Sequence, residues 1–325
     1  MSLTTTHDRP IRLDGRVAVV TGAGNGLGRQ YALALGRLGA KVVVNDLGGD
    51  VHGVGSDSTV AQTVVAEIRA AGGDAVADGH SVATPEGGAA IIDAAVQNYG
   101  RVDVLVSNAG ILRNADVVDS EPSDIEKVLA VHLWGAFNVL RPAMRDMSSR
   151  DYGRVVMVSS GVAAFGNVGQ AAYGAAKGGI WGLAKCAALE GEPHGVLVNT
   201  VMPVARTRMA DGMDGKGNHH DSATHDALLQ LIDPRAVAPL VAYLSSQECR
   251  VTGAAFSAGG GRFAQVFTGL SRGWVASNPN DASVDEIAAH FDDISDLSEY
   301  SVPDSLADEI GQLIRRLGSS GGSLA

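Results

Sequence analysis

A glycine-rich stretch near the N-terminus, TGAGNGLG at residues 21–28, most strongly limits what this chain can fold into. It follows the apolar run 17–20 and precedes residues 29–38, whose apolar positions recur with a helical period. Where a strand turns into a helix, free backbone N–H groups and the positive end of the helix dipole lie at the turn. Glycines there let the backbone approach a phosphate closely. The stretch therefore predicts the first strand-to-helix junction of an α/β sheet, with a pyrophosphate site.

Valine-rich runs alternate with helical patterns through the first 262 residues. Their near-continuous apolar character is typical of strands buried on both faces, as in a parallel sheet. The alternation therefore predicts a doubly wound α/β sheet with helices in layers on both sides. The strands are expected at residues 17–21, 41–45, 75–77, 102–106, 154–158 and 196–201.

Helix starts are also marked in the sequence. Residues 56–71 place apolar side chains at helical spacing. Thr84 followed by Pro85 is a typical cap and first position of a helix. Ser123 with Glu126 fits a capping box, which predicts a helix starting after Ser123.

The alternation stops after residue 262. Residues 283–294 and 305–318 have the pattern of two amphipathic helices, the second with five apolar residues on one face. We therefore expect a dinucleotide-binding domain over 12–262 and an α-helical extension over 263–325 packed on it. A loosely attached tail is the alternative.

Composition excludes several classes of partner. The net charge of −11 argues against nucleic acid, whose phosphates need basic patches. The chain has no apolar run of about 18 residues, so we expect no membrane span. The N-terminus lacks the apolar core of a signal peptide, and Cys186 and Cys249 are expected to be reduced thiols. These observations predict a cytoplasmic protein.

An acidic residue ends the second predicted strand. Asp46 lies 18 residues beyond Gly28, where a carboxylate accepts hydrogen bonds from the ribose hydroxyls of an adenosine. It would repel a 2′-phosphate, and residues 47–55 contain no Arg or Lys to hold one. The sequence therefore predicts NAD as the cofactor in preference to NADP.

A tyrosine and a lysine four residues apart carry the predicted chemistry. Tyr173 and Lys177 share one face of a helix rich in small residues. A neighbouring ammonium favours the phenolate, so Lys177 is expected to lower the pKa of Tyr173. Tyr173 then exchanges a proton with an alcohol or ketone while hydride moves to or from nicotinamide. Ser160, near the end of the preceding strand, is placed to hold the substrate oxygen.

These motifs together resemble the short-chain dehydrogenase/reductase family over residues 12–262. The resemblance implies a Rossmann fold and NAD(P)(H) as the cofactor, and we expect no bound metal. It also implies a homodimer or homotetramer assembled through helices near 121–147 and 170–190. The catalytic residues it implies are Ser160, Tyr173, Lys177 and His132. The cofactor-binding residues it implies are Gly22, Asn25, Gly26, Leu27, Gly28, Asp46, Ser81, Val82, Asn108, Ala109, Gly110, Tyr173, Lys177, Pro203 and Thr207.

Further segments are similar to a subfamily that oxidises (3R)-3-hydroxyacyl-CoA to 3-ketoacyl-CoA with NAD. That resemblance implies an acyl-CoA substrate. A hydroxysteroid or other alicyclic alcohol dehydrogenase is the alternative enzyme, and a non-catalytic NAD-binding regulator is the alternative of another class. The segments are 42–55, 108–113, 131–137, 165–179 and 237–244. Basic residues that would meet the CoA phosphates are Arg113, Arg206, Arg208 and Lys216.

Several positions depart from the family pattern. His132 stands where the family usually has Asn, so its imidazole either relays protons or satisfies a backbone group. His80 replaces the usual adenine-contacting Asp, which moves the expected contact to Ser81 and Val82. Thr207 is offset by one residue from the usual nicotinamide-binding Thr.

A polar, glycine-rich segment, 209–227, lies where the fold carries its substrate lid. It contains His219, His220 and His225, and neutral imidazoles are able to bind zinc. Because no cysteine or regular helical spacing supports a metal site, we expect a lid.

Overall fold

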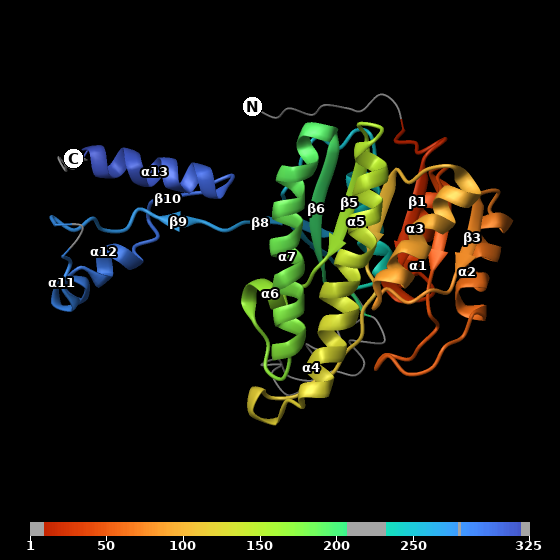
Figure 1. Cartoon of the computed structure of the whole chain (residues 1–325), viewed down its shortest axis with the longest axis horizontal. Helices are drawn as coiled ribbons and strands as arrows, with labels where there is room; N and C mark the ends of the chain where they lie inside the picture. Colours follow the sequence, from red (N-terminus) through yellow and green to blue (C-terminus); the bar gives the residue numbers. More distant parts are fainter. Residues whose placement is uncertain (1–9, 207–231, 279–280, 320–325) are drawn as a thin grey trace. The chain divides into compact units, whose positions relative to one another are not determined.

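The computed structural model describes residues 10–206, 232–278 and 281–319 (Figure 1). Among these residues, eight strands form one sheet in the order β3-β2-β1-β4-β5-β6-β7-β8. All pairings from β1 to β7 are parallel. The strands are β1 (Val17–Thr21), β2 (Lys41–Asn45), β3 (Asp74–Asp78), β4 (Val104–Ser107), β5 (Gly153–Val158), β6 (Val196–Pro203), β7 (Ala255–Gly259) and β8 (Arg262–Val266).

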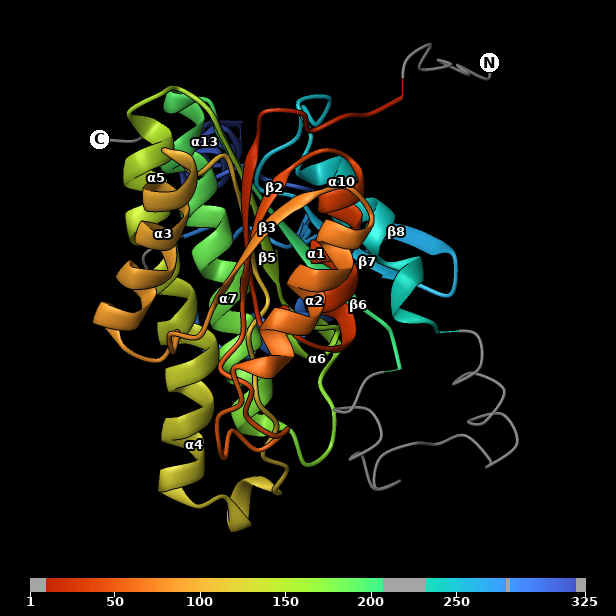
Figure 2. The ribbon, with the colours of Figure 1, turned by 90° about the vertical axis from the view of Figure 1, so that its right-hand side faces the viewer.

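Helices cover both faces of this sheet (Figure 2). One layer consists of α1 (Gly26–Arg37), α2 (Thr59–Ala70) and α10 (Ala238–Leu244). The other contains α3 (Pro85–Tyr99), α5 (Gly135–Ser148) and α7 (Ala171–Gly191). This is the predicted doubly wound, Rossmann-type arrangement. Shorter helical segments are η1 (Val117–Asp119), α4 (Pro122–Leu129), η2 (Ala130–Trp134), α6 (Val162–Phe165), η3 (Glu192–His194) and η4 (Pro234–Ala236).

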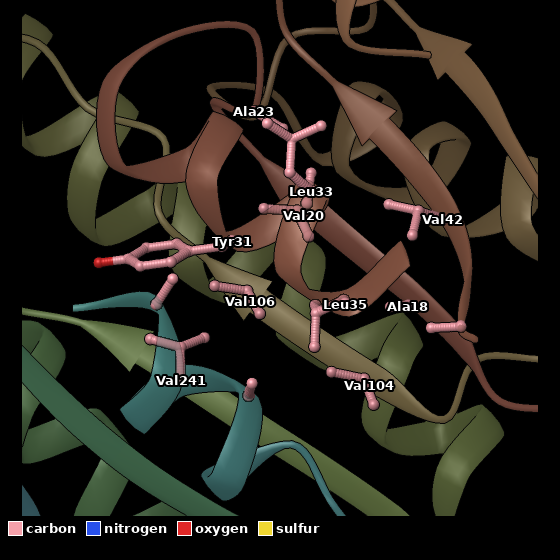
Figure 3. Packing of buried hydrophobic residues seen from close by; sticks show 14 of the residues in the cluster. Ala18, Val20, Ala23, Tyr31, Leu33, Leu35, Val42, Val104, Val106 and Val241 are labelled. Carbon is pink, nitrogen blue, oxygen red and sulfur yellow. The ribbon is translucent and has the colours of Figure 1, made fainter. Parts of the chain in front are cut away.

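The alternation of side chains along each strand produces a core on each face of the sheet. In β1, Ala18 and Val20 pack against α1 and α10, whereas Val17 and Val19 belong to the core under α3, α5 and α7. Successive strand residues point to opposite faces, so a strand covered on both sides must be apolar throughout. Figure 3 shows part of the first core, with Tyr31 and Leu35 of α1 near β4.

The order of the strands creates a switch point between β1 and β4. The chain runs outward from β1 to β3 and then returns to β4 on the other side of β1. Loops that leave the carboxyl ends of β1 and β4 therefore diverge, and ligands of doubly wound sheets bind in the crevice between them.

All six predicted strands are present, but the structure adds β7 and β8 to the sheet. Gly260 and Gly261 connect these two strands, and both have positive φ angles, +57° and +79°. A two-residue connection of this kind forms a hairpin with antiparallel strands. The sequence prediction missed this hairpin because its glycine-rich composition weakened the strand pattern.

One predicted helix start is confirmed and one is wrong. Thr84 caps α3 by accepting a hydrogen bond from the Gly87 amide at 3.1 Å, with Pro85 in the first turn. The capping box at Ser123 does not form, because α4 begins earlier, at Pro122, with Glu121 as its N-cap. Proline is favoured at the first helical position, and this preference outweighs the Ser/Glu pattern here.

The chain divides into two compact units, Met1–Gln265 and Val266–Ala325. In the second unit the first expected helix is interrupted at His290, which separates α11 (Val284–Ala289) from α12 (Phe291–Ser295). The other expected helix is α13 (Leu306–Ser319). Two short antiparallel strands, β9 (Leu270–Ser271) and β10 (Tyr300–Ser301), were not predicted. Packing of this unit on the first stays a prediction. Within the described ranges, no helix combines the length and apolar character needed to cross a membrane.

Candidate active site

The glycines of the loop between β1 and α1 are packed too closely to be replaced by larger residues. Gly22 has a φ angle of +62°, a left-handed conformation that favours glycine. A Cβ atom added at Gly28 would lie 2.1 Å from the carbonyl oxygen of Gly22. The side chain of Asn25, the N-cap of α1, does not cap the helix within the described part of the chain. The loop therefore leaves the first-turn N–H groups of α1 for an anionic ligand.

Asp46 joins this loop to the segment after β2. Its Oδ2 atom accepts a hydrogen bond from the Gly24 amide at 2.7 Å, and its Oδ1 atom accepts one from the Gly48 amide at 2.7 Å. A carboxylate has about four acceptor positions, so two remain for further donors such as hydroxyls. Asp46 thus shapes the loop and keeps the capacity to accept hydrogen bonds from a ribose.

Asn108 holds the loop after β4 on the end of β1. Its Nδ2 atom donates to the carbonyl oxygens of Thr21 at 3.0 Å and Gly22 at 3.1 Å. The Thr21 hydroxyl in turn accepts from the amides of Asn108 and Ala109. The side chain of Asn108 therefore positions the glycine loop, a role that the predicted cofactor contact did not include.

A cleft of about 350 Å³ opens at the switch point. The predicted cofactor residues that line it are Gly22, Asn25, Gly26, Leu27, Gly28, Asp46, Ser81, Val82, Asn108, Ala109 and Gly110. Sequence reasoning missed further lining residues, namely Asn45, Leu47, Gly49, Asp50, Val51, Gly53, His80, Ala83, Ile111 and Val131. Half of them lie on the loop after Asp46, whose Gly/Asp composition was the available signal. Three predicted cofactor residues are not among the residues that line the cleft. They are Pro203, at the end of β6, and Tyr173 and Lys177, in α7.

Lys177 is pinned to the end of β5. Its Nζ atom donates to the carbonyl oxygen of Val158 at 2.7 Å, and the Ser159 hydroxyl donates to the carbonyl oxygen of Lys177 at 2.8 Å. The Nζ atom lies 5.6 Å from the centroid of the Tyr173 ring. The structure therefore brings Tyr173 and Lys177 together at the carboxyl end of β5, with Ser160 two residues beyond that strand.

The pKa values of this pair differ from the sequence prediction. Burial raises the pKa of Tyr173, and a hydrogen bond with the Ser160 side chain opposes this shift. Burial also lowers the pKa of Lys177 to about 7, because removal from water penalises the ammonium. The predicted lowering of the Tyr173 pKa by Lys177 is therefore wrong for this structure.

His132 connects the cleft to Tyr173. It lies in the π-helical segment η2, and its Nε2 atom is 2.7 Å from the carbonyl oxygen and 3.0 Å from the amide nitrogen of Ile111. Its ring makes an edge-on contact with the Tyr173 ring, with centroids 5.3 Å apart. A glycine is required at position 110, beside the His132 ring, because a Cβ atom added there would lie 2.3 Å from His132 Cε1.

The imidazole of His132 is buried and neutral. Burial, reinforced by the charge of Lys177, lowers its pKa to about 3. A proton on Nε2 satisfies the contact with the Ile111 carbonyl, whereas a proton on Nδ1 lets Nε2 accept from the Ile111 amide. In either tautomer the Nδ1 atom has no hydrogen-bond partner among the described residues. The backbone role predicted for His132 is present, and Nδ1 remains available for a second role.

Other predicted residues are engaged elsewhere or lie outside the described chain. Arg113 contacts Asp124 and the carbonyl oxygen of His52, so its guanidinium is not free for CoA phosphates. Over the described ranges, no three His, Cys, Asp or Glu side chains are grouped to hold a metal ion. Outside the described residues lie Thr207, Arg208, Lys216, His219, His220, His225 and the predicted lid.

Comparison with known proteins finds relatives along almost the whole chain. The model of the short chain dehydrogenase family matches residues 16–215. Peroxisomal multifunctional enzyme type 2 of Drosophila melanogaster is 39% identical over 315 residues, which are 96% of this chain and 50% of that protein. The chain thus spans about half the length of this relative. The full-length structure of the Drosophila enzyme has a TM-score of 0.77 and 34% identity, covering 95% of this chain and 50% of that one.

Two further solved structures are similar over most of their own length. A short chain dehydrogenase from Mycobacterium avium has a TM-score of 0.74 and 36% identity, covering 87% of this chain and 97% of that chain. A 7α-hydroxysteroid dehydrogenase in complex with NADH and 7-oxo glycochenodeoxycholic acid has a TM-score of 0.68 and 25% identity. The match covers 77% of this chain and 95% of that chain.

Proposed function

This chain belongs to the short-chain dehydrogenase family, and we propose that it oxidises a secondary alcohol to a ketone with NAD. The substrate that we propose is a (3R)-3-hydroxyacyl-CoA, which becomes a 3-ketoacyl-CoA. Identity of 39% along almost the whole chain with a multifunctional enzyme type 2 supports this substrate, as do the sequence segments noted above. The observation that carries the reaction type is the contact of Tyr173 with Lys177 and His132 beside the cleft.

The cleft has the features that a dinucleotide needs. Tight packing at Gly28 keeps the glycine loop bare, and the N-terminus of α1 would hold the pyrophosphate. Asp46 would accept the ribose hydroxyls and repel a 2′-phosphate, which supports NAD over NADP. When bound, NAD supplies the acceptor for the hydride that leaves the carbinol carbon.

In this proposal the Tyr173 oxygen takes the proton of the alcohol while its own phenolic proton passes on to the Lys177 amine. Ser160 holds the substrate oxygen, and the Lys177 amine, with a pKa of about 7, accepts that proton at neutral pH. His132 Nδ1, a buried ring nitrogen without a partner in the described chain, would hold a water molecule that carries the proton onward. Loss of the proton from oxygen and of the hydride from carbon together leave the ketone.

Hydroxysteroid oxidation is the second candidate. The solved neighbour that holds NADH and an oxidised bile acid supports it, but at 25% identity. The same Ser, Tyr and Lys side chains would serve both substrates, because they meet only the carbinol group. A non-catalytic NAD-binding regulator is disfavoured, because it would not need both Tyr173 and Lys177.

The assembly and the cellular location stay predictions. Exposed apolar side chains, Trp134 at 59% and Leu189 at 52%, lie in the helices expected to form a homodimer or homotetramer. A cytoplasmic location was expected from the sequence, whereas the Drosophila relative is named a peroxisomal enzyme.

A panel of substrates tests the proposal directly. Purified protein is given (3R)-3-hydroxyacyl-CoA, its (3S) isomer or a hydroxysteroid, with NAD or NADP, and NADH or NADPH formation is followed by absorbance. We expect turnover of the (3R) thioester with NAD, and a loss of about 10²- to 10⁴-fold in Tyr173→Phe with NAD binding retained. Faster turnover of the steroid would favour the second candidate. Unchanged turnover in Tyr173→Phe would contradict the proposed role of Tyr173.

A further inference from the structure

The loop after β2 forms a strap along one side of the cleft. We define the strap as residues 47–57, and its base is closed by a hydrogen bond from the Asp57 amide to the Leu47 carbonyl at 3.1 Å. A compact loop of about this length with adjoining ends is an Ω-loop. Asp50 stabilises its tip by accepting from the amides of His52 at 2.9 Å and Val54 at 2.8 Å. The strap is therefore an ordered wall of the cleft.

Three hydrogen bonds fasten the strap to the segment after β4. The Leu112 amide donates to the Val51 carbonyl at 2.9 Å, and His52 Nδ1 donates to the Leu112 carbonyl at 3.0 Å. Arg113 Nη2 donates to the His52 carbonyl at 2.9 Å, while its Nη1 atom contacts Asp124 of α4 at 3.1 Å. Two walls of the cleft, which come from opposite sides of the switch point, are thus joined directly.

On the strap side of this joint little apolar surface is buried, whereas Ile111 and Leu112 on the other side are buried. Val51 is only partly buried, and His52, Val54 and the rest of the strap tip are exposed. Close backbone approach does occur at Gly53, where an added Cβ atom would lie 3.0 Å from Ile111 Cγ2. Because hydrogen bonds rather than buried area hold the strap, loss of one bond will change how readily it opens.

Resting on the proposed binding of NAD, we propose that His52 and Arg113 are positioning residues that keep the strap closed over a bound dinucleotide. Val51, Asp50 and Gly53 line the cleft on the strap side, and Ile111 lines it on the other. Closure of this joint slows the departure of the cofactor, and opening sets its rate of release. Neither residue takes part in the chemical step.

Cofactor release measured without turnover tests this role. NADH bound to the protein is displaced by excess NAD in a stopped-flow instrument, and the loss of its fluorescence gives the dissociation rate. Loss of one net hydrogen bond corresponds to a change of about three- to tenfold in a rate. We therefore expect the NADH dissociation rate to rise by that factor in His52→Ala and in Arg113→Ala. His52→Asn retains an amide donor near the position of Nδ1 and is expected to restore most of the wild-type rate. The controls are His194→Ala and Arg37→Ala, which change exposed side chains elsewhere in the fold.

The melting temperature without cofactor separates positioning from general stability. We expect it to be nearly unchanged in His52→Ala, because this side chain is exposed. Dissociation rates equal to wild type in both strap variants would overturn the proposal, as would rates that rise only in proportion to a fall in melting temperature. If the wild type failed to bind NADH at all, the proposed function would fail first.

Discussion

The buried amine of Lys177 lies 2.7 Å from the carbonyl oxygen of Val158 at the end of β5. Burial lowers its pKa to about 7 in the folded chain, against about 10.5 when exposed. Between these values the unfolded chain binds a proton that the folded chain does not. The free energy of unfolding therefore gains a contribution from Lys177 that rises with pH across this window.

Replacement of Lys177 by methionine is expected to remove that rise. The free energy of unfolding, measured with urea between about pH 7 and pH 9, should rise more steeply with pH in the wild type than in Lys177→Met. The difference between the two slopes should be at most about 1.4 kcal/mol per pH unit. Other titrating groups contribute equally to both proteins, so the difference isolates Lys177. Equal slopes in the two proteins would show that the amine is not desolvated.

His132 is expected to have an effect at acidic pH. Its pKa falls from 6.5 in the unfolded chain to about 3 in the folded chain, so its stabilising contribution is present above 6.5 and is lost as pH falls toward 3. A His132→Phe variant should lack this part of the acid destabilisation, measured by urea unfolding from about pH 4 to pH 7.

The proposed proton relay through His132 makes a separate prediction. We expect His132→Phe to lower kcat by about tenfold or more, with KM little changed, because Nδ1 no longer holds water. His132→Asn supplies an amide acceptor and should recover part of kcat. An unchanged kcat in His132→Phe would leave His132 with its backbone role alone.

Asp46 is expected to govern the choice between NAD and NADP. Asp46→Asn removes the charge but keeps an oxygen for the amide of Gly24 or Gly48, so the loop should stay folded. We expect the Kd for NAD to rise about ten- to hundredfold and discrimination against NADP to relax, because hydrogen bonds to a carboxylate are replaced by neutral ones. Titration calorimetry with both cofactors measures this, with the exposed Asp93→Asn in α3 as the control. A wild type that prefers NADP would contradict the assignment.

The glycine loop is expected to reject even a methyl group. Gly28→Ala would place Cβ 2.1 Å from the Gly22 carbonyl oxygen, so the loop must shift. We expect destabilisation by about 1–3 kcal/mol and loss of NADH binding. The matched control is Gly311→Ala in α13, whose Cβ would meet only the flexible Arg315 side chain at 3.4 Å. That change should stabilise its helix by about 0.5–1 kcal/mol. Normal NADH binding by Gly28→Ala would refute the tight packing.

The sequence by itself determined the order of strands and helices and the identity of the family. Apolar runs marked the buried strands, and the spacing of Tyr173 and Lys177 placed both on one helical face. These properties depend on neighbours a few residues apart, so a local pattern contains them. The local pattern predicted the wrong start for α4, where a proline and a capping-box signal compete. It did not reveal the hairpin of β7 and β8, where glycines weaken the strand pattern.

Only the tertiary structure decided how the site is tuned. The direction of the Lys177 amine, the raised pKa of Tyr173 and the neutral His132 all follow from burial, to which residues from several elements contribute. The joint between Val51 and Leu112 links segments about sixty residues apart. Desolvation and long-range hydrogen bonds depend on which segments contact each other in the folded chain. The periodicity of one stretch of sequence does not predict those contacts.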